Sequence, residues 1–241
     1  MIWLAILALG LVSGTLSGIV GFGASIMLMP VLMLAFGPLE AVPIMAIAAL
    51  MANLSRVVVW WREVDWGANA FYCATAIPAS ALGARTLLVL EPRLVEGILG
   101  AMFLVMVPAR RRLMARGLAI KAWHLALVGA GIGFLSGMVA STGPINTPFY
   151  LAYGLTKGAY LSTEALGSLA IGFTKAVVFQ RFDALPLETV ARGLVVGSTL
   201  MIGSRLAKGF VLRLDPHQFR LLMEVLLCAA GIILLWGAII R

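Results

Sequence analysis

Two short stretches of this chain combine glycine and proline with hydroxyl and amide side chains inside otherwise apolar sequence. The first is Gly21-Phe22-Gly23-Ala24-Ser25, with Pro30 following, and the second runs from Ser141 to Pro148. In lipid, irregular backbone persists only where protein buries it or where it lines a polar cavity. The N-termini of half-helices offer free N–H donors and partial positive charge, which favour an anion. Close helix packing at glycine is the alternative, but the hydroxyl and amide side chains favour a site that binds small anions.

Two basic residues lie several positions inside apolar windows. Arg56 follows Ser55, Lys175 follows Thr174, and the two cations are 119 residues apart. A cation at membrane depth costs at least about 2.5 kcal/mol and usually faces a pathway. Snorkelling to the nearer interface is the alternative, but the matching positions favour side chains that face the interior. The full candidate set for substrate binding is Gly21, Gly23, Ser25, Asn53, Arg56, Ser141, Thr142, Gly143, Asn146, Thr147 and Lys175.

The remaining titratable residues do not suggest catalysis. The two histidines, His124 and His217, have no Cys, Asp or Glu at metal-ligand spacing, and no paired-carboxylate helix motif is present. Glu164 follows Ser162-Thr163 and resembles a residue at the start of a helix, and no buried acid stands out as a proton carrier. We therefore expect neither an enzyme nor a cofactor.

The composition requires that lipid surrounds most of the protein. Hydrophobic residues make up 62% of the 241 residues and charged residues 12%, whereas soluble domains carry about 25% charged residues. The mean hydropathy is +1.04. A chain of this length accommodates roughly eight spans of about 20 residues. The sequence therefore predicts an all-α, multi-pass membrane protein with lipid as a partner.

The net charge of +8 is concentrated in one linker. Five basic residues and no acid lie within 110–121. A basic block beside membrane spans is typical of a cytoplasmic loop, so the linker indicates topology and not binding to nucleic acid.

Apolar windows divide the chain into two similar halves. They fall at about 2–36, 43–61, 68–90, 93–109, 122–154, 163–180, 186–207 and 217–240. The first and fifth windows are too long for one straight span, and each is interrupted by one of the polar stretches, so both are predicted to be broken helices. Several short matches recur in the same order, among them Leu16-Ser17-Gly18 with Leu135-Ser136-Gly137. We expect repeat 1 at 1–109, a basic cytoplasmic linker at 110–121 and repeat 2 at 122–241.

The relative orientation of the repeats depends on the broken helices. If each one re-enters as a hairpin, the halves are inverted, whereas a full crossing by each makes them parallel. Inversion places the basic residues of 205–220 on the cytoplasmic side, so the positive-inside rule favours inversion.

The broken segments also resemble those of a known family. The stretch Leu16-Ser17-Gly18-Ile19-Val20-Gly21-Phe22-Gly23 through Pro30, and its counterpart from Leu135 through Pro148, are similar to the TauE/SafE sulfite exporter family, also called the 4-toluene sulfonate uptake permeases. Ala24 replaces one glycine of the glycine run usual in that family. The resemblance implies transport of small sulfur-containing or organic anions, such as sulfite or sulfonates, across a bacterial inner membrane.

The function predicted from these observations is a carrier whose two repeats alternate access to a small anion bound between the breaks. Two alternatives remain open, a membrane scaffold that transports nothing and an anion channel. The sequence also leaves open the direction of transport, the coupling ion and whether the chain forms a homodimer.

Overall fold

The computed structural model describes residues 2–21, 23–115, 119–138, 142–155 and 157–210, together with Cys228, Ile232, Leu235 and Trp236. All regular secondary structure in these residues is helical, as the apolar windows predict. The helices are α1 (Ile2–Val20), α2 (Ala24–Phe36), α3 (Pro38–Val59), η1 (Trp61–Glu63), α4 (Trp66–Val89), α5 (Pro92–Ala115), α6 (Ala122–Met138), α7 (Gly143–Tyr153), α8 (Lys157–Arg181) and α9 (Leu187–Phe210).

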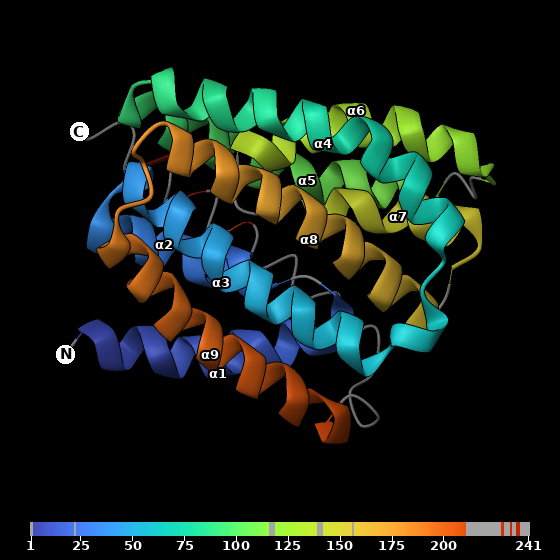
Figure 1. The fold of residues 1–241 in the computed structure, drawn as a ribbon, viewed down its shortest axis with the longest axis horizontal. Helices are drawn as coiled ribbons and strands as arrows, with labels where there is room; N and C mark the ends of the chain where they lie inside the picture. Colours follow the sequence, from blue (N-terminus) through green and yellow to red (C-terminus); the bar gives the residue numbers. More distant parts are fainter. Residues whose placement is uncertain are drawn as a thin grey trace.

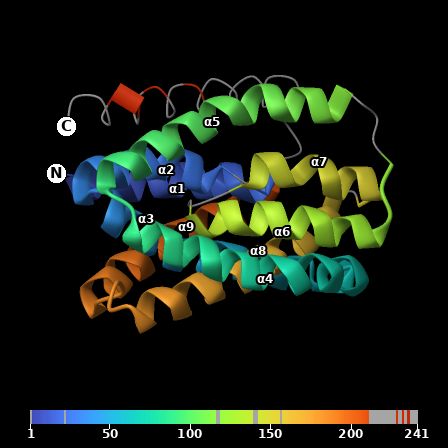
Figure 2. The ribbon, with the colours of Figure 1, turned by 90° about the horizontal axis from the view of Figure 1, so that it is seen from above.

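Both long apolar windows are broken helices that fold back on themselves. The ring of Trp3, at the start of α1, lies 5.5 Å from the ring of Phe36, the last residue of α2. In the second window, the backbone nitrogen of Ile120 donates to the carbonyl oxygen of Ala152 at 3.2 Å. Each pair of helices is therefore a hairpin that enters and leaves at the same end of the bundle. The two hairpins enter from opposite ends (Figures 1 and 2).

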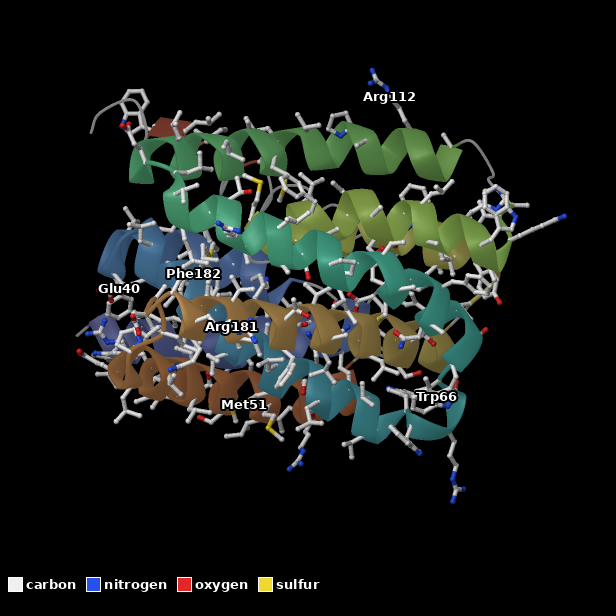
Figure 3. The ribbon with its side chains drawn as sticks, turned by 45° about the horizontal axis from the view of Figure 1, so that its top comes forward. Glu40, Met51, Trp66, Arg112, Arg181 and Phe182 are labelled. Carbon is white, nitrogen blue, oxygen red and sulfur yellow. The ribbon has the colours of Figure 1, made fainter. Side chains whose placement is uncertain are left out.

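The longer helices run along the bundle and connect its two ends (Figure 1). Glu40 at the start of α3 pairs with Arg192 near the start of α9, and Arg85 lies 5.7 Å over the Phe182 ring. At the other end, the backbone nitrogen of Asp65 donates to Thr163. Figure 3 shows Glu40 and Phe182 near one end and Trp66 at the other. We call these the Glu40 end and the Trp66 end.

Small residues bring helices from the two halves into close contact. α1 packs along α9, and α6 packs along α4. A Cβ atom at Gly14 would lie 2.6 Å from the carbonyl oxygen of Leu200, and one at Gly133 would lie 2.6 Å from the Cα of Ala76. Only glycine permits such backbone approach, which is the usual way in which membrane helices associate.

The apolar residues are distributed as a lipid environment requires. The central core is built largely from α2 and α3, where Leu28, Met29, Ile44 and Met45 are fully buried. Large apolar side chains are also exposed on the outside, and Val89 is 79% exposed. By length and mean hydropathy, two helices in the described part of the chain are able to cross a membrane, at Leu39–Val59 and Trp66–Val89.

The helix bounds differ from the apolar windows at several places, and α3 already begins at Pro38, before the window at 43–61. α5 continues to Ala115, so Arg110, Arg111 and Arg112 belong to its last turns and the connection to α6 is shorter than the predicted linker. Arg112 projects away from the bundle (Figure 3). α8 begins at Lys157, before the window at 163–180, because its first turns pack against Trp60 and Glu63 despite their polar residues. The last window, 217–240, lies outside the described residues except for isolated positions.

Candidate functional site

The first helix break depends on two glycines with positive φ. Gly21 has φ of 84° and Gly23 has φ of 128°, which side chains with a Cβ rarely adopt. The backbone nitrogen of Gly21 still bonds to the carbonyl oxygen of Ser17, at 2.8 Å, and closes α1. α2 then starts at Ala24, so the amides of its first turn have no partner within the helix. Gly21, Gly23 and Ser25 all line one internal cavity.

The second break faces the same cavity. α7 starts at Gly143, and the backbone nitrogens of Ile145 and Asn146 both bond to the carbonyl oxygen of Thr142 at 3.0 Å. The hydroxyl groups of Thr142 and Ser136 are hydrogen-bonded to each other. Thr142, Asn146 and Ser136 line the cavity and are buried.

Two residues predicted at the second break, Gly143 and Thr147, do not line the cavity. The hydroxyl of Thr147 donates to the carbonyl oxygen of Gly143 at 2.7 Å and lies 2.7 Å from the Tyr160 hydroxyl. Thr147 and Gly143 therefore shape the first turn of α7 without lining the cavity. Ser141 lies outside the described residues.

Both predicted cations are buried and point into the same cavity. Arg56 is 6% exposed and Lys175 is 4% exposed, so the prediction that they face the interior is confirmed. The Nη2 of Arg56 donates to Asn53, which also lines the cavity. The Nζ of Lys175 donates to the carbonyl oxygen of Ser136 at 2.9 Å, in the last turn of α6.

An acid that the sequence did not single out completes the charged groups. Glu164 is 3% exposed, and its Oε2 lies 2.8 Å from the Nη1 of Arg56. Its Oε1 accepts a hydrogen bond from Ser168 at 2.7 Å. The interpretation of Glu164 as a residue at the start of a helix is wrong, because α8 begins seven residues earlier. No buried acid stands out as a proton carrier in the sequence, whereas the structure buries Glu164 in the cavity.

The cavity is small and lined by residues from seven helices of the described chain and from the two breaks. About 50 Å³ is open to the centres of water molecules, which suffices for a few waters or one small ion, because one water needs about 10–15 Å³ by this measure. Sequence reasoning also missed Tyr72 of α4, which closes one wall. An unremarkable tyrosine within a predicted span gave no signal of this role.

The charged groups give the cavity a positive balance. Among the described residues that line it, Arg56 and Lys175 are basic and Glu164 is acidic, which leaves a formal charge of +1. The Nε of Arg56 makes no hydrogen bond in the described part of the chain. A buried donor without a partner costs about 1–3 kcal/mol, so this arrangement is suited to receive an anion. Within the described residues, no group of three metal-ligating side chains occurs.

Comparison with known proteins gives one match that covers nearly the whole chain. The family model described as Sulfite exporter TauE/SafE matches residues 6–234. No curated protein and no solved structure matches the chain.

Proposed function

Because this chain belongs to the sulfite exporter TauE/SafE family, a family of membrane transporters, we propose that it is a carrier for small sulfur-containing or organic anions such as sulfite or sulfonates. The observation that carries this proposal is that two helix breaks and two buried cations meet in one cavity. Neither break alone, nor a single buried cation, would distinguish a binding site from tight packing.

The bound anion would exchange its water shell for donors from several elements. The first turn of α2 supplies backbone N–H groups, and the starts of α2 and α7 each contribute about half a positive charge. The hydroxyl groups of Ser25 and Thr142, which line the cavity, add further donors. Arg56 and Lys175 supply the full charges. Many weak donors with few full charges suit a carrier, because a carrier must also release its substrate.

We infer that the two halves are duplicated and inverted in the membrane. In support, helix starts recur at a spacing of 119 residues: Ala24 and Gly143 begin α2 and α7, while Pro38 and Lys157 begin α3 and α8. Gly14 and Gly133, which make the close contacts of α1 and α6, have the same spacing. The hairpins that enter from opposite ends are the arrangement expected of inverted repeats.

The charge distribution supports an orientation in a bacterial inner membrane. Arg62 of η1 and Arg110, Arg111 and Arg112 in the last turns of α5 lie at the Trp66 end. At the Glu40 end, the acids Glu40, Glu91, Asp183 and Glu188 are accompanied by Arg85, Arg181 and Arg192. By the positive-inside rule the Trp66 end faces the cytoplasm. Alternating access would then follow from rocking of the two hairpins, each of which covers the cavity from one side.

Counterflow in proteoliposomes tests this function. Vesicles that contain purified protein are loaded with unlabelled sulfite and diluted into labelled sulfite, and a panel of sulfonates is offered as competitors. A carrier gives transient, saturable accumulation of label that depends on the internal anion. Label that enters without dependence on internal anion would indicate a channel, and no flux of any anion would indicate a scaffold.

A further inference from the structure

Glu164 is the acidic side chain among the described residues that line the cavity. Its carboxylate is bonded to Arg56 on one oxygen and to Ser168 on the other, and it is almost fully buried. If an anion binds Arg56 in its place, an ionised Glu164 would be left buried with one neutral donor. A buried carboxylate without a charged partner takes up a proton, because burial disfavours the ionised form.

Glu164 has no acidic counterpart in the first half. The residue 119 positions earlier is Met45, whereas Lys175 corresponds to Arg56 and Ser136 to Ser17 at the same spacing. All six of these residues line the cavity. In its charged groups the cavity is therefore similar from its two sides except at this position, where one carboxylate reduces a formal charge of +2 to +1.

We propose that Glu164 is the proton acceptor that matches the site to the charge of its substrate. This inference rests on the proposed carrier function. A monoanion binds with Glu164 ionised and leaves the site neutral. A dianion binds with one proton on Glu164 and again leaves the site neutral. The carrier thus takes up one proton with each dianion and none with each monoanion.

The proton comes from water on the side from which the anion enters, and it bonds to Oε2 of Glu164. The Nη1 of Arg56 then loses its acceptor on Glu164 and donates to the dianion, while Oε1 keeps its bond from Ser168. On the other side, release of the dianion and of the proton restores the Arg56 pair. Lys175 remains bonded to Ser136 throughout and supplies constant charge.

The other titratable groups near Glu164 are less suited to this role. The phenols of Tyr72 on α4 and Tyr150 on α7 lie close enough to Glu164 to interact electrostatically with its carboxylate. Tyrosine, however, keeps its proton at neutral pH in water. Arg56 on α3 stays protonated in proteins, and Lys175 lies three turns away along α8, about 16 Å by helix rise. Among the described cavity residues, the carboxyl of Glu164 is therefore the group best suited to gain a proton when a dianion binds and to lose it when the dianion is released.

Sulfate and methanesulfonate test the charge rule with nearly equal shapes. Both are tetrahedral. Sulfate is a dianion, and methanesulfonate is a monoanion in which a methyl group replaces one of the sulfate oxygens. Neither changes its charge between about pH 5 and pH 8, so any proton taken up belongs to the protein. Binding to purified protein in weakly buffered detergent solution is followed with a pH indicator, and labelled sulfite exchange in proteoliposomes checks that the carrier is active.

We expect about one proton per sulfate bound and none per methanesulfonate. Wherever one proton is taken up with each sulfate, sulfate affinity should rise about tenfold for each unit that the pH falls, while methanesulfonate affinity changes little. Glu164→Gln should remove the proton uptake and the pH dependence for sulfate. Glu164→Asp should retain both, which separates loss of the titrating group from general damage to the site.

Several results would overturn the proposal. Equal proton uptake on binding of sulfate and of methanesulfonate by the wild-type protein would contradict it. This comparison needs no variant, so it holds even if Glu164→Gln and Glu164→Asp do not fold. Rejection of sulfate at every pH by protein that binds methanesulfonate would also contradict it, as would pH dependence that survives in folded Glu164→Gln. Absence of sulfite exchange by the wild type would instead refute the carrier function, and the inference with it.

Discussion

The Nζ of Lys175 donates a hydrogen bond of 2.9 Å to the carbonyl oxygen of Ser136, in the last turn of α6. Carbonyl groups in the last turn of a helix have no partner within the helix, and a cation near them is favourable. Lys175 therefore joins α8 to the edge of the second break. The same side chain provides positive charge in the cavity, so it serves both the shape of the break and the proposed binding of an anion.

Replacing Lys175 with Met should lower the initial rate of sulfite exchange at least about tenfold. The substitution keeps the length and apolar stem of the side chain but removes the charge, which is worth more than one factor of ten in a medium of low dielectric. Exchange in proteoliposomes measures the rate, and size-exclusion chromatography verifies the fold.

Arg85 is the matched control for that substitution. It is exposed at the Glu40 end and lies over the ring of Phe182, outside the cavity. Arg85→Met should leave exchange within about twofold of the wild type. Unchanged rates in Lys175→Met and in Arg56→Met would contradict a role for these cations in transport.

Gly21 and Gly37 allow backbone strain to be separated from crowding of the site. Both have positive φ, 84° and 78°, so alanine is strained at either position. A Cβ at Gly21 would lie 3.0 Å from the Nη1 of Arg56, whereas one at Gly37 meets nothing within 4 Å. We expect both substitutions to lower stability by about 1–3 kcal/mol, and Gly21→Ala alone to weaken anion binding.

Thermal unfolding in detergent and competition binding with methanesulfonate measure the two effects. Equal loss of binding in Gly21→Ala and Gly37→Ala would mean that strain alone is responsible. Unchanged binding in folded Gly21→Ala would show that the Arg56 side of the cavity does not contact the anion.

Asn146→Asp should weaken binding of methanesulfonate at least about tenfold at neutral pH. Asn146 is 3% exposed and lines the cavity. A carboxylate at this position would therefore cancel the cavity's formal charge of +1 and repel an anion at close range. Asn69→Asp adds the same charge on α4, where Asn69 accepts a hydrogen bond from Cys73 outside the cavity lining. If the two variants lose affinity equally, a general field effect explains the result and the site lies elsewhere.

The features predicted from the sequence are those with a local signal. Glycine and proline within apolar stretches identified both breaks, and the equivalent positions of Arg56 and Lys175 indicated their burial. Of the eleven predicted site residues, eight line the cavity: Gly21, Gly23, Ser25, Asn53, Arg56, Thr142, Asn146 and Lys175. Whether they bind substrate stays a prediction.

Glu164 escaped detection because its environment is made by distant residues. Its ion-pair partner lies 108 positions away on α3. The polar residues before it lower the local hydropathy and hide the first two turns of α8. Tyr72 and Ser168 contribute to the cavity only through the packing of α4 against α8, which no local pattern encodes.

The orientation in the membrane can be tested with single cysteines. Ala115, at the end of α5, and Glu91, between α4 and α5, are both exposed and lie at opposite ends of the bundle. In a background in which Cys73 and Cys228 are replaced by Ala, a membrane-impermeant thiol reagent should label Glu91→Cys from the periplasmic side of right-side-out vesicles. Ala115→Cys should react only after permeabilisation. The reverse pattern would place the basic linker outside and refute the orientation.

The location of a heavier analogue of sulfite tests the central claim most directly. Selenite has the shape and charge of sulfite, and selenium gives an anomalous X-ray signal that identifies its position in a crystal. We predict one anomalous peak in the cavity between the starts of α2 and α7, within hydrogen-bonding distance of Arg56 or of the backbone amides at Ala24 or Ser25. A selenite peak elsewhere, with only water in this cavity, would contradict the account.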